Sequence, residues 1–289
     1  LLESSIFSLE IYFAHRNYLP SIGLVLALFG LTSGLLNHYP KFAVMFKKIF
    51  PFAFTGLFLA YAAADFGRAT MWSNNNSLLI HAQIHHAASP RMRSELLLAA
   101  LYAKRVDLAL QQADIAMQTA PPNERRTIQL WRILAYCYAQ QPQPGTELSA
   151  LYSMPADRIT MATSDALGYV SAAAEANACP GLDSMRLGKL AGSWAVSTVQ
   201  PSHSPWVWKA HVASARLLAS SGDLQEGFKQ AQWAFNDSGF NFDVGILAFQ
   251  LANSIEDEKA AMEIMQQLRA NESRYTDSQR SQLRALRKQ

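Results

Sequence analysis

The hydrophobic and polar positions divide the sequence into an apolar first part and an amphipathic second part. Residues 18–37 form a run without any charge, and residues 49–64 form a second, shorter run. About 20 apolar residues cross a bilayer core as a helix. The first run has this length, and Lys48 and Phe66 extend the second toward it. The pattern predicts two membrane spans, at about residues 19–37 and 49–66, joined as a helical hairpin within a transmembrane region of residues 1–66. The alternative is a buried helix in a soluble core.

After Asp65 the sequence becomes rich in Ala, Leu, Gln and Arg, with helical spacing and almost no strand-like alternation. Small residues follow the turn at residues 221–223, beginning with Gly227, and they recur at Ala261 after one tetratricopeptide period. Small side chains at these positions allow two helices to cross closely. The sequence predicts an all-α fold, with a connecting helix at residues 67–90 and a tetratricopeptide-like α-solenoid at 91–289. The clearest helical hairpins are expected at residues 91–120 and 206–270.

The distribution of charge supports this division and suggests a topology. Only 16% of the residues are charged, against about 25% in ordinary soluble domains. The segment between the two predicted spans, residues 37–48, is expected to be a loop, and it carries Lys41, Lys47 and Lys48. Short loops rich in Lys stay on the cytoplasmic side. We therefore predict a multi-pass protein of the inner (cytoplasmic) membrane with its repeat domain in the periplasm. A net charge of +3 without a basic cluster argues against nucleic-acid binding.

The cysteine and histidine content restricts the chemistry further. Two cysteines exclude a disulfide-dense scaffold and a cysteine-based zinc module. In an oxidising periplasm Cys137 and Cys179 could form a disulfide, with two free thiols as the alternative. His81 and His85 have zinc-like spacing, with His86 beside them, but no Glu lies between them and no third ligand is evident. No metal and no cofactor are therefore expected.

Four polar residues precede the first predicted span, whose start is marked by Pro20. They are Glu10, His15, Arg16 and Tyr18. Polar side chains at the membrane often line a cavity or a pathway, and the guanidinium fork of Arg can donate two hydrogen bonds to a phosphate. We interpret the four residues as candidates for binding a lipid-linked phosphate. The alternative is an interfacial anchor, in which Lys would serve as well as Arg.

Two short motifs resemble a bacterial membrane family that is similar to the transmembrane-and-tetratricopeptide O-mannosyltransferases. The first, Arg16-Asn-Tyr-Leu-Pro-Ser21, has one residue fewer between Arg and Tyr than some members. The second, Arg68-Ala-Thr-Met-Trp72 followed by Leu78, has Ala69 in place of the usual Asn. The resemblance covers residues 2–120 and marks Pro20, Arg68 and Trp72 as structural motif positions. It implies a GT-C-like glycosyltransferase that uses a polyprenyl-phosphate-linked sugar, with its catalytic acid in an earlier external loop.

The sequence therefore supports two main functional hypotheses. In the first, this is the C-terminal portion of a membrane glycosyltransferase that begins upstream of Leu1, and these 289 residues alone are not active, with no catalytic residue identified. In the second, it is a non-enzymatic membrane-anchored scaffold for envelope or surface-polysaccharide assembly, whose repeats bind a protein or peptide. A third hypothesis, an O-antigen-ligase-like oligosaccharyltransferase, lacks its His-rich loop here. The expected partners are membrane lipid or a polyprenyl-phosphate sugar, and a protein on the repeat domain.

Overall fold

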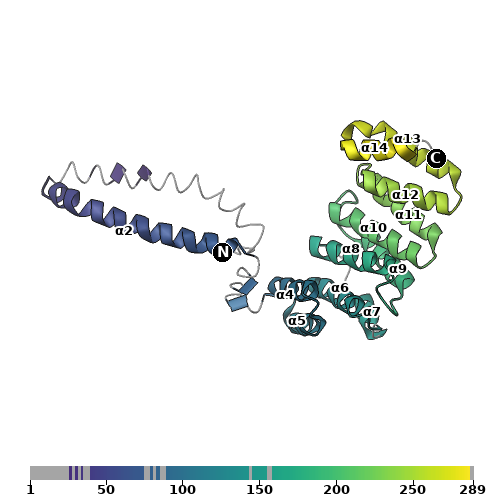
Figure 1. Cartoon of the computed structure of the whole chain (residues 1–289), viewed down its shortest axis with the longest axis horizontal. Helices are drawn as coiled ribbons and strands as arrows, with labels where there is room; N and C mark the ends of the chain where they lie inside the picture. The colour runs from purple at the N-terminus through teal and green to yellow at the C-terminus, as the bar shows by residue number, and fades with distance from the viewer. Residues whose placement is uncertain are drawn as a thin grey trace. The chain divides into compact units, whose positions relative to one another are not determined.

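The computed structural model describes residues 26–27, 30–31, 34, 40–74, 79–80, 83–84, 89–142, 145–154 and 158–286. Every complete element in these ranges is helical and none of their residues is in a strand, which confirms the all-α class. The chain forms two compact units, Leu1–Ala87 and Ala88–Gln289 (Figure 1). Each unit is described by itself.

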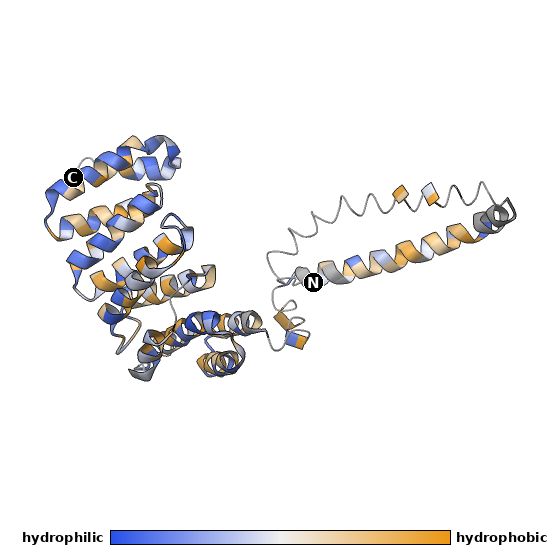
Figure 2. Ribbon diagram, turned by 180° about the vertical axis from the view of Figure 1, so that it is seen from behind, coloured by the Kyte–Doolittle hydropathy of each residue, from blue (hydrophilic) through white to orange (hydrophobic). Residues whose placement is uncertain are grey.

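The first unit contains one long apolar helix, α2 (Pro40–Trp72). Figure 2 shows hydrophobic residues along most of its length. Within α2, the stretch Lys48–Gly67 is the only part of the described chain that is long and apolar enough to cross a membrane. Its large apolar side chains are exposed, for example Phe52 at 82% and Phe66 at 73%. The stretch coincides with the second predicted span.

The segment before this stretch differs from the prediction. Because α2 begins at Pro40, Lys41, Lys47 and Lys48 lie on the helix, so the loop predicted at 37–48 is wrong from Pro40 onwards. Lysine is a good helix former, so a charged residue that ends an apolar run does not end a helix. Pro51 lies inside α2 and not in its first turn; it removes one backbone donor there. Of the first predicted span, residues 26–27, 30–31 and 34 are helical, and the rest lies outside the described residues.

The second unit is a stack of helices joined by short connections (Figure 1). From α9 to α12 each helix packs against the next one along the chain, whereas α8 packs on both α6 and α10. The elements are α4 (Pro90–Tyr102), α5 (Val106–Thr119), α6 (Pro122–Tyr138), α7 (Gly145–Tyr152), α8 (Met161–Glu175), α9 (Ser184–Ser197), α10 (Pro205–Ser220), α11 (Leu224–Asp237), α12 (Phe242–Ser254), α13 (Glu258–Ala270), the 3₁₀ turn η1 (Glu272–Arg274) and α14 (Asp277–Leu286).

The turns after α10 and after α12 have the same design, a residue with positive φ followed by an Asp that caps the next helix. In the first turn the residue with positive φ is Gly222, at 89°, and in the second it is Glu256, at 59°. In each turn the next residue, Asp223 or Asp257, caps the following helix by accepting a hydrogen bond from the backbone N–H three residues later. An Asp at this position satisfies one of the free N–H groups of the helix start. The pairs α10–α11 and α12–α13 therefore share one local design.

The two helices of the first pair cross closely at Gly227 of α11. A Cβ atom at this position would lie 3.1 Å from the Ala215 carbonyl oxygen and 3.3 Å from the Ala219 nitrogen, both on the backbone of α10. Backbone atoms cannot move aside as the end of a flexible side chain can. The close crossing predicted from the small residues is thus confirmed at this position.

A disulfide bond joins Cys137 to Cys179. Cys137 is in the last turn of α6 and is fully buried, while Cys179 lies in the connection that follows α8. The two residues are 42 positions apart in the sequence. A cross-link of this kind restricts the unfolded chain and typically contributes about 2–4 kcal/mol to stability. It ties the end of α6 to the connection between α8 and α9.

We expect Gly227→Leu to lower the free energy of unfolding of the full chain by about 1–3 kcal/mol, because overpacking at a helix crossing forces the backbones apart. Gln225→Leu is a matched control, since Gln225 lies on the same helix and is exposed. Both variants are compared with the parent by urea denaturation followed by circular dichroism. Equal stability of Gly227→Leu and the parent would contradict the close crossing.

Candidate functional site

The phosphate-binding candidates from the sequence cannot be placed. Glu10, His15, Arg16, Tyr18 and Pro20 all lie outside the described residues. The lipid-phosphate interpretation of this segment therefore stays a prediction. A candidate site has to be built from residues elsewhere in the chain.

The other motif residues are placed only in part. Arg68 and Trp72 lie in the last turns of α2, and their side chains are outside the described set. The histidines His81, His85 and His86 lie outside the described residues. In the first unit, the structure thus brings together no group of functional side chains that can be described.

In the second unit, a groove of about 760 Å³ lies between α9 and α11, beside the end of α10. We name it the Trp233 groove after the largest side chain that lines it. A smaller hollow of about 320 Å³ continues around Trp233 and Val196 toward His211 and Asp237. The walls of the groove include Lys189, Gly192, Val196, Glu226, Lys229, Gln230 and Trp233.

Two glycines of α9, one helical turn apart, let this helix approach its neighbours. A Cβ on Gly188 would lie 2.8 Å from the Leu218 side chain, and a Cβ on Gly192 would lie 3.0 Å from the Gln230 amide. The Ser214 hydroxyl donates a hydrogen bond of 2.7 Å to the Gly188 carbonyl and so ties α10 to α9. The absence of a side chain at Gly192 leaves room for Gln230 to reach across.

A chain of hydrogen bonds runs from the surface of the groove into its wall. The Gln230 amide nitrogen donates to the Glu226 carboxylate at 2.9 Å. The Gln230 amide oxygen therefore faces inward, where it lies 2.6 Å from Nδ1 of His211. Since an amide oxygen can only accept, Nδ1 of His211 is the nitrogen that carries the proton. In the neutral ring this contact makes Nδ1 the protonated nitrogen.

His211 is buried, with 4% of its surface exposed. Burial lowers the pKa of the imidazole below its ordinary value, because the charged form loses its hydration. The hydrogen bond to Gln230 and the negative charge of Asp237 act in the opposite direction, but burial is the largest effect. The neutral ring is thus the form that suits the folded protein.

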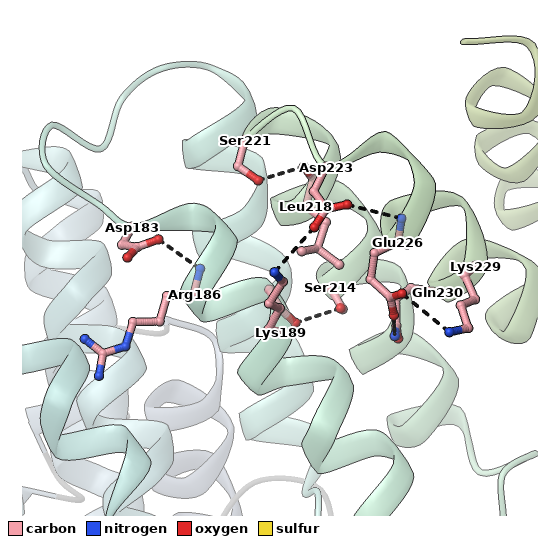
Figure 3. A network of polar contacts seen from close by, with 11 residues as sticks. Asp183, Arg186, Lys189, Ser214, Leu218, Ser221, Asp223, Glu226, Lys229 and Gln230 are labelled. Atoms are coloured by element: carbon pink, nitrogen blue, oxygen red, sulfur yellow. Dashed lines mark hydrogen bonds and ion pairs between the residues drawn. The ribbon is translucent and has the colours of Figure 1, made fainter. Parts of the chain in front are cut away.

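Ion pairs surround the rim of the groove (Figure 3). Lys189 extends from α9 to Asp223 at the start of α11, with 3.5 Å between Nζ and Oδ2. Lys229 lies 3.5 Å from Glu226, one turn away on α11. Both lysines are more than half exposed, so each pair contributes little to stability. The pairs leave the rim close to neutral.

Trp233 lies where the groove meets the smaller hollow, since it lines both, and it is 38% exposed. Its ring packs against the His211 ring at 5.5 Å between centroids, and the Lys229 ammonium lies 5.4 Å from its centroid on the open side. Two contacts thus fix its position while part of its surface stays open. Val196, across the groove on α9, is 66% exposed. These two side chains form an apolar centre inside a polar rim.

The groove is built for binding more than for covalent chemistry. The hydroxyl that lines it, that of Ser193, donates to the Leu190 backbone carbonyl and not to a base, and nucleophilic catalysis requires such a base. Within the described residues no group of three His, Cys, Asp or Glu side chains is placed to hold a metal ion. An apolar centre with a polar rim is the usual composition of a protein-binding surface.

Sequence analysis did not single out Trp233 or His211. The distinguishing signal was the Gln230–Trp233 segment, in which a polar and an aromatic residue share one face of α11. That signal has meaning only when the facing helix is known to carry a glycine, Gly192.

We expect the free energy of unfolding to fall as the pH falls through the ordinary His pKa of 6.5. The unfolded chain binds a proton there, whereas buried His211 in the folded chain resists it, so protonation favours unfolding. In His211→Gln this part of the pH dependence should disappear. His203→Gln is the control, because His203 is exposed. Urea titrations between about pH 7.5 and 5.5 measure the slope, and an unchanged slope in His211→Gln would show that His211 is not the responsible group.

The comparisons with known proteins leave the site to be interpreted from its own chemistry. The scan of family models, the search of curated proteins and the search of solved structures each found no match to this chain. The O-mannosyltransferase resemblance therefore rests on the two short motifs alone. Function has to be argued from the geometry of a site and not from a fold, and the Trp233 groove is the site with the clearest geometry.

Proposed function

We propose that this chain is a membrane-anchored helical-repeat module that binds a protein partner in the periplasm. The single observation that carries the proposal is the Trp233 groove, in which a fixed, partly exposed aromatic side chain lies inside a rim of paired charges. The proposal corresponds to the second hypothesis drawn from the sequence, that of a membrane-anchored scaffold. The supporting arguments concern the repeat, the membrane and the compartment.

The repeat architecture is supported by the recurrence of the capped turn, first at Asp223 and then at Asp257. This spacing is one tetratricopeptide period, and such repeats consist of helix pairs that stack on one another. The crossing at Gly227 has the small residue that such a pair requires. We propose that α4 to α14 form a tetratricopeptide-like solenoid, in which α14 with its charged surface is the terminal cap.

The membrane anchor is supported by α2. Its stretch Lys48–Gly67 has the length and composition of a span. Apolar side chains exposed on every side of a helix are unfavourable in water and favourable in lipid. We propose that this span pairs with the apolar run at residues 18–37, so that the chain is multi-pass with a helical hairpin in the inner membrane.

Two independent features support the proposal that the repeat domain is periplasmic. The disulfide between Cys137 and Cys179 suits an oxidising compartment such as the periplasm, since cytosolic thiols are kept reduced. Lys47 and Lys48 stand at one end of the span, and lysines favour the cytoplasmic side. Both features suggest that the α2 end near Trp72 and the repeat domain are periplasmic.

Trp233 is the side chain most suited to anchor a partner. Tryptophan is enriched among the few residues that supply most of the free energy of binding at protein interfaces. Its contacts with His211 and Lys229 hold the ring in place before binding, which reduces the entropy lost on association. We propose that an apolar side chain of the partner packs between Trp233 and Val196.

The glycosyltransferase hypothesis for the parent protein stays a prediction. It depends on Glu10, His15, Arg16 and Tyr18, which lie outside the described residues. The binding function proposed for the repeat domain is compatible with either an enzyme or a scaffold as the parent protein.

We expect a membrane-impermeant maleimide added to intact cells to label Ser73→Cys in the full-length protein and not Lys47→Cys. The reason is that the two positions flank the span. The parent protein should show no free thiol at Cys137 or Cys179 when it is unfolded without reductant, because both are in the disulfide. Labelling of Lys47→Cys from outside, with none at Ser73→Cys, would reverse the topology.

For the groove, a photo-crosslinking amino acid at Val196 should trap a periplasmic protein in cells. Trp233→Ala should reduce that crosslink at least tenfold, since removal of a central anchor commonly costs about 2 kcal/mol or more of binding. A crosslinker at Met262 of α13, which is equally exposed at 66%, is the matched control. The yield is measured by mass spectrometry and normalised to protein level. Equal crosslinking at Val196 and Met262, or no effect of Trp233→Ala, would contradict the proposal.

A further inference from the structure

A second groove, of about 500 Å³, lies between α8 and α10. We name it the Gly168 groove. One wall is formed by α8 with Ser164, Asp165, Gly168 and Tyr169, and the other by α10 with Lys209. It shares no lining residue with the Trp233 groove. Two features of α8 in this groove reduce the stability of the domain without any structural need.

The first feature is Gly168 itself. It lies in the interior of α8 with ordinary helical backbone, and a Cβ atom at this position would meet nothing within 4 Å. Glycine inside a helix is less stable than alanine because it loses more conformational entropy. Neither a turn nor a close packing partner explains it here, in contrast to Gly227. The position keeps space open in the groove.

The second feature is Ser164, one helical turn before Gly168 and therefore on the same face. Its side chain is buried, with 2% of its surface exposed. Its hydroxyl has no hydrogen-bond partner among the described residues. Buried hydroxyl groups in native proteins are almost always paired, because an unpaired one loses its hydration without compensation. An unpaired hydroxyl beside an open space indicates a ligand that supplies its hydrogen-bond partner.

The charges of the groove indicate the chemistry of that ligand. Among the ion pairs of the described residues, none includes Lys209 or Asp165. The Lys209 ammonium is positioned over the Trp206 ring at 5.3 Å from its centroid. Arg216, farther along α10, already has Glu175 as a partner at 3.7 Å. The α10 wall thus offers a cation without a carboxylate, and the α8 wall offers an acceptor without a donor.

We infer that the Gly168 groove binds an extended peptide segment through one acidic side chain. The carboxylate of that side chain lies over Gly168, where it accepts hydrogen bonds from the Lys209 ammonium and the Ser164 hydroxyl. A backbone N–H of the same segment donates to Asp165. The hydroxyl can turn toward the ligand, because serine side chains occupy three staggered positions. The inference does not depend on the Trp233 groove or on its proposed partner.

An extended peptide suits the length of the groove as well as its charges. The lining residues of α8 extend from Ser164 to Ala172, which is about 12 Å along a helix. An extended chain covers that distance with about three to four residues. Its backbone offers donors and acceptors together, which matches an acceptor on one wall and a cation on the other.

The probe is the peptide acetyl-Gly-Ala-Val-Glu-Ala-Gly-amide, and its twin carries Gln in place of Glu. Both are titrated against the labelled full chain in nanodiscs by microscale thermophoresis. We expect the Glu peptide to bind about tenfold more tightly than the Gln twin, as a charge-assisted hydrogen bond is about twice as strong as a neutral one. Equal affinity of the two peptides, or binding of neither, would overturn the inference.

Four variants distinguish an effect on ligand binding from an effect on folding. Gly168→Leu fills the open space and should abolish binding of the Glu peptide, while Gly168→Ala should raise the Tm by about 2–4 °C. Lys209→Met keeps the length of the side chain and should remove the preference for Glu over Gln. Trp233→Ala is the control in the other groove and should leave peptide binding unchanged, so that the two sites are tested separately. Peptide binding retained by Gly168→Leu, or lost in Trp233→Ala, would contradict the site.

Discussion

The close approach of α9, α10 and α11 is the constraint on which the rest of the described helical stack depends. Gly188 and Gly192 on α9 and Gly227 on α11 lie where a Cβ would meet a neighbouring helix. Because Gly192 has no side chain, the polar side chain of Gln230 can cross from α11 to His211 on α10. That bond orients the imidazole, and the imidazole packs on Trp233. The exposed face of the groove is therefore determined by glycines beneath it.

The two grooves differ in whether their buried polar groups have hydrogen-bond partners. In the Trp233 groove the chain from Glu226 through Gln230 to His211 is satisfied at each step, and a satisfied network rigidifies its surroundings. In the Gly168 groove the Ser164 hydroxyl is left without a partner among the described residues. Departures from good packing and pairing are expected at functional positions, where stability is given up for binding. The first groove is thus preformed, and the second is completed by its ligand.

Sequence reasoning identified those features that depend on local spacing. The helical class, the turn at Gly222, the close crossing at Gly227 and the position of the apolar stretch in α2 all follow from residues near one another in the sequence. The lysine loop was wrong because charge marks the end of an apolar run, whereas a helix ends only where backbone geometry requires it. Trp233 and Ser164 were missed because their exposure and pairing depend on a facing helix. Periodicity assigns a residue to a face of its own helix, but it does not say what covers that face.

A membrane anchor lowers the intrinsic affinity that each groove needs in order to bind its partner. Each groove is small, and a site that holds one or a few side chains binds weakly as an isolated peptide site. If α2 anchors the domain and a partner is confined to the same membrane or has a second contact on the domain, the second binding event is effectively intramolecular. Effective concentrations then reach the millimolar range for short linkers, so a weak contact in one groove combined with a second contact gives a tight complex. Since the two grooves share no lining residue, a ligand in one groove leaves the other open, and a second contact of the same partner with the membrane would add to its specificity.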